Sequence, residues 1–265
     1  EPNGFLRFTT VGGWDERVLP AHGVDVKTRT GELHRGVIGT PPPHILKPEE
    51  RNKPFLVENL FIDVGARSAE EVADLGITVG DSAVPAYPFR ELSNGVVMGK
   101  ALDDRAGCTV LIRALEVLMA MDAEPLDVQI VAVFSTFEEV GARGAQVASY
   151  TINPDLALVL EGTVAADCPG VPASRCPSRQ DGGPAITLID RTAHLPRSQV
   201  MFIENLAAEL KIPCQLKTPA YGGTNAARIH MVRSGVPTSV ISVPCRYIHS
   251  PNSTLRVEDL NRTIL

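Results

Sequence analysis

The sequence predicts an α/β protein in which a small β-rich part precedes a larger part with alternating helices and strands. Residues 1–84 are rich in glycine and in short apolar runs that turn residues separate. From residue 85 onward, helical stripes alternate with apolar runs of strand length, which is typical of a sheet covered by helices. The chain has 265 residues, of which 44% are hydrophobic and 21% charged, so it can form two domains with separate cores.

The first part, residues 1–84, is predicted to be a small β-barrel or sandwich. Its apolar runs of strand length are Phe5–Phe8, Gly23–Val26 and Leu56–Val64, with turns at residues 11–15 and 30–32. Ser68 stands three residues before Glu71, which is the spacing of a capping box. We therefore expect one short helix that begins there and ends near Gly76.

The second part, residues 85–265, is predicted to be a largely parallel sheet with helices on both faces. A helical stripe follows Asp103 and consists of Val110, Leu111, Ala114, Leu115, Leu118 and Met119. Three further helices are expected, at Ile203–Leu210, at Asn225–Arg233 and from Val257 onward. The expected strands are Val128–Phe134, Leu156–Leu160, Ala185–Ile189 and Thr238–Val243. The first of them is almost continuously apolar, which predicts burial on both faces.

Composition excludes several classes of partner. A net charge of −6 without a basic stripe argues against a nucleic-acid-binding protein. The longest apolar stretch, residues 128–137, is about half of what spans a bilayer, so we expect no membrane partner. The first residues lack the features of a signal peptide. The five cysteines are odd in number and include no CxxC pair, which favours free thiols in the cytoplasm.

Acidic residues and one histidine follow several of the predicted strands. Open α/β sheets place their sites beyond the carboxyl ends of the strands, so these side chains are expected at one edge. They are Asp103, Asp104, Glu138, Glu139, Glu161 and His249. Most have an ordinary structural explanation as well, because an Asp before a helix can cap it and a Glu pair can be a solvated turn. Glu161 is harder to explain in that way, since it directly ends an apolar strand, where an unpaired carboxylate is costly to bury.

Such a set suits divalent cations, which bind carboxylate oxygens and imidazole nitrogens. The neighbouring glutamates, Glu138 and Glu139, point to opposite sides of an extended chain. One of them can bind a metal while the other reaches a water molecule, as a general base does. Two metals that share a carboxylate would polarise a carbonyl group and activate that water.

Five segments together resemble the tetrahedral (TET) dinuclear-metal aminopeptidases, which include the glutamyl and leucyl aminopeptidases of bacteria and archaea. Gly99–Gly107 is similar to the motif of the metal-bridging aspartate, and Ser135–Ala145 to the paired-glutamate motif. The other three segments are Leu160–Gly170, Pro244–Pro251 and Val11–Asp15. They occur in the order and spacing of that family over essentially the whole chain.

The resemblance implies a three-layer, zinc-peptidase-like catalytic domain with a mostly parallel or mixed sheet over residues 85–265 and an inserted β-rich dimerisation domain over residues 1–84. It implies that Asp103 bridges two divalent ions and that Glu138 is the general base. Glu139 and His249 would complete one metal site with Asp103, and Glu161 would serve the other. Zinc or cobalt would be the metal, and manganese also suits these ligands. The implied reaction removes N-terminal residues from short peptides, in dimers that assemble into a tetrahedral dodecamer.

Two features depart from the pattern of that family. The family has a His-x-Asp motif that supplies a histidine to the second metal, and none of the six histidines here is followed two places later by Asp. We therefore expect an incomplete second site, as if an opening segment and the end of the last helix were absent. Asn225 stands where the family has Asp, and it is expected to cap the following helix.

Two alternatives to an aminopeptidase remain open. One is a non-catalytic oligomerisation module, because a chain without the His-x-Asp segment is expected to be poorly active by itself. A glycoside hydrolase is the other, because some members of this family have been labelled endoglucanases. Glycosidases need two carboxyl groups that flank one bond, however, and adjacent glutamates that point apart do not.

Overall fold

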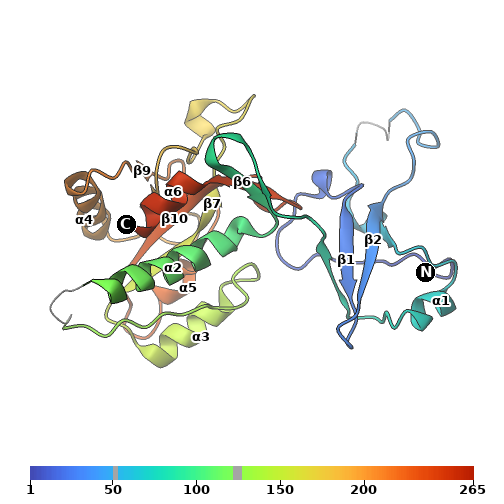
Figure 1. Cartoon of the computed structure of the whole chain (residues 1–265), viewed down its shortest axis with the longest axis horizontal. Helices are drawn as coiled ribbons and strands as arrows, with labels where there is room; N and C mark the ends of the chain where they lie inside the picture. Colours follow the sequence, from blue (N-terminus) through green and yellow to red (C-terminus); the bar gives the residue numbers. More distant parts are fainter. Residues whose placement is uncertain (50–52, 122–126) are drawn as a thin grey trace. The chain divides into compact units, whose positions relative to one another are not determined.

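The computed structural model describes residues 1–49, 53–121 and 127–265, and these form two compact units (Figure 1). The first unit consists of Glu1–Phe89 and the short segment His249–Asn252. The second unit consists of Arg90–Ile248 and Ser253–Leu265. In the part of the chain that the structure describes, every helix is too short or too polar to cross a membrane.

The first unit is built on a four-stranded antiparallel sheet with the order β3-β2-β1-β4. The strands are β1 (Gly23–Lys27), β2 (Leu33–Gly39), β3 (Phe61–Asp63) and β4 (Ser82–Pro85). Alternate side chains of β1 point into the core, where Val24 and Val26 are buried. Leu19, Ile38, Leu60, Ile62 and Ile77 complete this core.

Two predicted strands of this unit are wrong in extent. Phe5–Phe8 forms only a single bridge, between Leu6 and Ile62. Leu56–Val64 is interrupted by a 3-10 turn, η2 (Val57–Asn59), before β3 begins. The N–H groups of Asn59 and Leu60 donate to carbonyl groups three residues earlier, so they are not available to a neighbouring strand.

The predicted capping box is confirmed and begins helix α1 (Ala69–Asp74). The Ser68 hydroxyl accepts the Glu71 N–H at 3.3 Å. The Glu71 carboxylate accepts the N–H of Arg67, at 2.8 Å, one residue before the usual position. A further 3-10 turn, η1 (Glu16–Val18), follows Asp15, whose carboxylate accepts the Arg17 N–H.

The second unit contains a seven-stranded sheet centred on β10 (Thr238–Arg246). One edge of β10 pairs with β7 (Ala157–Val164) in parallel, along the whole length of β7. The other edge pairs antiparallel with β8 (Ala185–Ile186) and with β11 (Ser253–Arg256). The outer strands are β9 (Gln215–Leu216), β6 (Val96–Gly99) and β5 (Arg90–Glu91), the last two joined through the 3-10 turn η3 (Ser93–Gly95).

The sheet is therefore mixed, which agrees with one of the two sheet types that the family resemblance implies, whereas the largely parallel sheet expected from the alternation of helices and strands is wrong. Only the pairs β7–β10 and β8–β9 are parallel in the described residues, whereas β5–β6, β6–β11, β10–β11 and β8–β10 are antiparallel. Short turns connect β5 to β6 and β10 to β11, and a short turn can join only antiparallel strands. The strands predicted at 156–160 and 238–243 are longer than expected, and the strand at 185–189 is shorter.

Val128–Phe134 is neither a strand nor buried, in contrast to the prediction. No strand that the structure describes pairs with it, and its Val, Ile and Phe side chains are 40–67% exposed. A strand buried on both faces needs ladder partners and covering helices, and sequence periodicity cannot show whether they are present. The apolar run is thus an exposed surface of this structure.

Helices between residue 102 and residue 264 complete the described part of the second unit (Figure 1). They are α2 (Leu102–Ala120), α3 (Arg143–Ile152), α4 (Arg197–Glu209), α5 (Ala226–Ile229) and α6 (Val257–Ile264), and a second 3-10 turn of this unit is η4 (Ala173–Arg175). Helix α2 packs on β7 and α6, and α3 packs on α5. The predicted α2 stripe is buried at Val110, but Met119 is 86% exposed because the end of the helix extends beyond this core. The helix predicted at 225–233 is shorter than expected.

Candidate metal centre

Asp103 lies in the first turn of α2, where the backbone is not helical. Its φ and ψ are −91° and 105°, so its side chain does not point in the direction that a helical backbone would give it. The main chain of Asp103 packs directly against Gly162 on β7. A Cβ atom on Gly162 would lie 3.2 Å from the Asp103 Cα, so the absence of a side chain at 162 permits this approach.

Glu138 and Glu139 lie in a tight turn immediately before α3. The Glu138 carbonyl accepts the N–H groups of Gly141 and Ala142 at 3.0 and 2.9 Å. Gly144 donates its N–H to the Thr136 carbonyl, so a backbone bond also joins the residues before the two glutamates to the start of α3. These backbone bonds hold the two glutamates in place.

Asn225 supports the same turn and does not cap α5, which corrects the prediction. It makes no capping bond with its side chain, because its own backbone is already helical. Its Nδ2 donates instead to the Ser135 hydroxyl at 3.2 Å, three residues before Glu138. The Thr224 hydroxyl takes the capping role and accepts the Ala226 N–H.

Glu161 lies inside β7 and not at its end, because β7 continues to Val164. Its register partner on β10 is Ser242, whose hydroxyl donates to Glu161 Oε1 at 3.3 Å. Burial raises the pKa of the Glu161 carboxyl well above its usual range, and the Lys217 ammonium opposes this rise. The carboxylates of Asp103, Asp104 and Glu138 raise it further.

His249 follows the end of β10 by three residues. Its carbonyl accepts the N–H of Asp15 at 2.9 Å, and its ring lies over Gly13. A Cβ atom on Gly13 would be 3.1 Å from His249 Nδ1, so a larger residue would press on the ring. The glycine-rich turn at residues 11–15 thus fixes the histidine.

Three of the predicted site residues form one group that fits a divalent cation. Asp103, Glu139 and His249 each offer a ligand atom, and these atoms all lie within 4.8 Å of one another. Two carboxylate oxygens and one imidazole nitrogen are a donor set that zinc, cobalt and manganese accept. Burial raises the pKa of Asp103, and the charges of Glu139, Asp104 and Glu138 raise it further, so a cation here would relieve repulsion.

Two residues that the sequence prediction did not include interact with Asp103 or Glu161. Lys217 follows β9, is 3% exposed, and acts electrostatically on Asp103 and Glu161. Ser242 is fully buried and holds Glu161. Neither residue had a signal in the sequence, because the burial of Lys217 depends on the pairing of β8 with β9 and the role of Ser242 on the register between β7 and β10.

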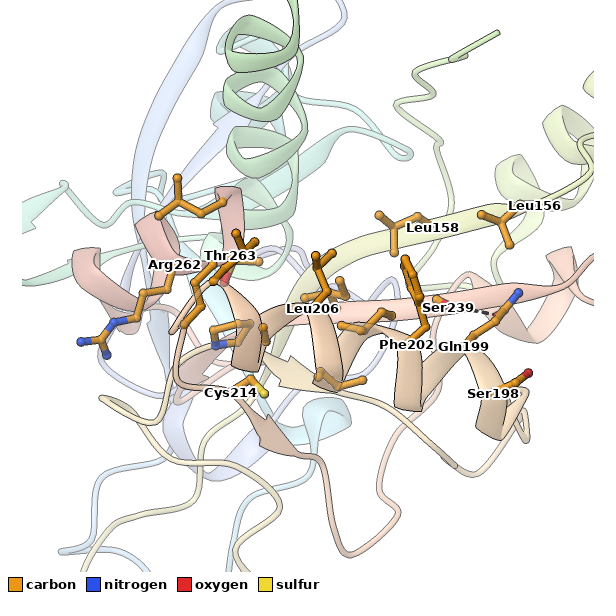
Figure 2. Close-up of a pocket in the computed structure, with 18 of the residues that line it drawn as sticks. Leu156, Leu158, Ser198, Gln199, Phe202, Leu206, Cys214, Ser239, Arg262 and Thr263 are labelled. Atoms are coloured by element: carbon orange, nitrogen blue, oxygen red, sulfur yellow. Dashed lines mark hydrogen bonds between the residues drawn. The ribbon is translucent and has the colours of Figure 1, made fainter. Parts of the chain in front are cut away.

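An apolar pocket of about 420 Å³ lies elsewhere in the second unit (Figure 2). Phe202 and Leu206 of α4 line one side, and Leu156 and Leu158 line another. None of the five predicted site residues lines this pocket. It lacks the carboxylates that hydrolysis needs, so the acidic group is the candidate site.

A mixed α/β fold that brings carboxylates and an imidazole together in this way fits the class of metal-dependent hydrolases. Comparison with known proteins narrows this class. A family model described as M42 glutamyl aminopeptidase matches residues 1–265. The chain therefore belongs to the M42 family and is a metal-dependent aminopeptidase.

Relatives of known structure share the fold over the whole chain. A TET aminopeptidase from the archaeon Thaumarchaeota archaeon SCGC AB-539-E09 is 40% identical, with a TM-score of 0.94 over 100% of this chain and 74% of its own. An aminopeptidase from Desulfurococcus kamchatkensis is also 40% identical, with a TM-score of 0.92 over 100% and 72%. The lysyl aminopeptidase of Pyrococcus furiosus is 32% identical over 100% of this chain and 74% of its own length.

Two other similar structures bear on assembly and on the glycosidase alternative. The TET1 peptidase of Pyrococcus horikoshii, which is described as able to assemble into a tetrahedron or a large octahedral shell, is 30% identical with a TM-score of 0.84. A Thermotoga maritima structure titled endoglucanase is 34% identical with a TM-score of 0.70. The fold is thus common to proteins that carry either label.

Proposed function

We propose that the described acidic group is the catalytic centre of this aminopeptidase and that it holds two divalent ions. Asp103 would be a ligand of both ions, Glu139 and His249 would complete one site with it, and Glu161 would serve the other. The observation that carries the proposal is the convergence of Asp103, Glu139 and His249 within 4.8 Å. When bound, such ions supply a Lewis acid for the scissile carbonyl and lower the pKa of a water molecule.

Glu138 is the general base in this proposal. It shares the turn of Glu139 but is not a member of the group of three ligands. The proposal gives its carboxylate the task of taking a proton from the attacking water and passing it to the amine that leaves. The backbone bonds of the turn keep Glu138 in place relative to Glu139, so ligand and base are placed together.

Glu161 is assigned to the second ion for an electrostatic reason. A carboxylate with a raised pKa beside Asp103 is costly to ionise unless positive charge is near. Lys217 supplies part of that charge, and a second cation would supply the rest. Zinc or cobalt is the proposed metal, and manganese also fits these donors.

The proposed substrates are short peptides, from which the enzyme removes N-terminal residues. Self-association is also proposed, through a β-barrel or sandwich domain over residues 1–84 that makes dimers, and further into a tetrahedral dodecamer. The assembly named for the Pyrococcus horikoshii relative supports this. A cytoplasmic location is proposed because all five cysteines are free thiols.

The glycoside hydrolase alternative is disfavoured by geometry. A glycosidase places two carboxyl groups about 5–9.5 Å apart on either side of one bond. Glu138 and Glu139 are neighbours in one turn, and Glu139 belongs to the cation-binding group. The alternative of an inactive assembly module is tested by peptide hydrolysis with the chain beginning at Glu1.

Metal content per chain tests the proposed centre. The protein is loaded with zinc or cobalt, desalted and measured by elemental analysis, in parallel with Asp103→Ala and the exposed control Asp155→Ala. Bound metal in the wild type and in Asp155→Ala, but not in Asp103→Ala, is the expected result. Equal metal in all three proteins, or none in the wild type, would remove Asp103 from the proposed role.

A further inference from the structure

A single carboxylate oxygen connects the start of α2 to β7. Asp104 Oδ1 accepts the N–H of Gly107 at 2.9 Å and the N–H of Gly162 at 2.8 Å. The bond to Gly107 is an ordinary capping bond within the first turn of the helix. The bond to Gly162 is different, because it reaches 58 residues along the chain to the residue after Glu161.

The two backbones that this oxygen joins are in direct contact. A Cβ atom on Gly107 would lie 2.6 Å from the Glu161 Cα, closer than side chains are found. A Cβ atom on Gly162 would lie 3.2 Å from the Asp103 Cα. Glycine at 107 and 162 therefore lets α2 approach β7 without intervening side chains, and Asp104 fastens that contact.

The contact sets the spacing of two proposed metal ligands. Asp103 directly precedes Asp104, and Glu161 directly precedes Gly162, so the bond joins the backbone beside one ligand to the backbone beside the other. The Asp104 carboxylate itself is not part of the cation-binding group. A helix cap alone needs only the Gly107 bond and does not account for the bond to β7.

We propose that Asp104 is a positioning residue that holds Asp103 and Glu161 at the separation a pair of divalent ions requires. The inference rests on the proposed function and adds a residue that does not touch the ions. Both N–H groups bind the same oxygen, Oδ1, so an amide at this position can replace the carboxylate. The geometry, and not the charge of Asp104, is what the site uses.

The experiment compares Asp104→Ala and Asp104→Asn with Asp259→Ala. Asp259 is a matched control in the same unit, since its carboxylate also accepts two backbone N–H groups, those of Asp181 and Gly183. Cobalt affinity and the visible spectrum of the cobalt-loaded protein are measured. Asp104→Ala should bind cobalt about 10- to 100-fold more weakly, with an altered spectrum. Asp104→Asn and Asp259→Ala should bind it about as the wild type does.

Two results would overturn the inference while leaving the proposed function intact. One is wild-type cobalt binding by Asp104→Ala, and the other is binding by Asp104→Asn as weak as by Asp104→Ala. If Asp104→Ala does not fold, hydrogen exchange at the Gly162 amide is measured instead, in the wild type and in Asp104→Asn. Slow exchange in both is expected, and fast exchange in the wild type overturns the inference. No bound metal in wild type and Asp259→Ala would overturn the proposed function as well.

Discussion

Glu161 on β7 and Ser242 on β10 are register partners, and the serine hydroxyl donates to Glu161 Oε1 at 3.3 Å. The bond joins β7 and β10, which form the longer of the two parallel strand pairs in the described residues. It orients a carboxylate that burial would otherwise favour in its neutral form. The hydrogen bond from the buried Ser242 hydroxyl thus favours the ionised form of Glu161, which is the form that binds a cation.

Ser242→Ala should therefore weaken divalent-ion binding by about tenfold, because a ligand that loses its supporting hydrogen bond is less well oriented. Ser239→Ala is the matched control, since Ser239 is also buried on β10 but bonds to Gln199. Isothermal titration calorimetry with zinc measures the affinities of the two variants. Equal affinities in the two variants would show that Ser242 does not support the site.

Glu138→Gln should retain its metal and lose turnover by a factor of about 10² to 10⁴, which is the usual contribution of a general base. Glutamine keeps the size of the side chain but cannot take a proton from water. Steady-state hydrolysis of a short peptide, together with elemental analysis, separates the two effects. Glu139→Gln is the comparison and should lose metal, because Glu139 belongs to the cation-binding group. Normal turnover by Glu138→Gln would exclude it as the base.

Removal of divalent ions should abolish peptide hydrolysis. A chelator such as EDTA would strip the proposed site, and zinc, cobalt or manganese should restore activity after desalting. A glycosidase with two carboxyl groups usually needs no metal, so the same treatment would leave it active. Peptide and β-glucan substrates are assayed side by side before and after chelation. Peptide hydrolysis that survives complete removal of metal would contradict the mechanism.

The ion-free protein should become less stable as pH rises from about 4 to about 7. Burial raises the pKa of Asp104 from 3.8 to about 7, and it raises the pKa of Asp103 and Glu161 well above the usual range. Between the unfolded and folded pKa values the folded state binds more protons than the unfolded state. The free energy of unfolding must then fall as pH rises.

Urea unfolding at pH 4.5, 6.0 and 7.5 in the presence of a chelator measures this dependence. Asp104→Asn should show a shallower decline, because it removes one of the titrating groups. Divalent ions should oppose the decline, since they stabilise the ionised carboxylates. Stability that rises across this interval, to the same extent in both proteins, would show that the cluster does not control it.

Ile130→Ala should change the free energy of unfolding by no more than about 0.5 kcal/mol, as is usual for exposed positions. The same substitution at the buried Ile186 should cost about 2–5 kcal/mol, because it removes apolar contacts and leaves a cavity. Ile130 is 50% exposed and Ile186 is 1% exposed. Denaturant midpoints of the two variants provide the test. A large loss at Ile130 would mean that Val128–Phe134 is packed in solution.

Local signals in the sequence predicted several elements correctly. The Ser68 capping box begins α1, and the helix predicted from Val257 is α6. Both depend on neighbours within a few residues, so the chain itself carries the information. The orientation of the strands does not depend on near neighbours, because it is set by which distant segments pair. That is why the largely parallel sheet and the strand at Val128–Phe134 were wrong predictions.

The sequence by itself determined which residue types are available for chemistry, namely the paired aspartates, the paired glutamates, Glu161 and His249. Only the tertiary structure decided how neighbours divide their roles. Asp103 joins the cation-binding group, whereas Asp104 turns to the backbone of β7. The physical reason is that a side chain's direction follows from local backbone angles, but its partners come from segments that only folding brings near.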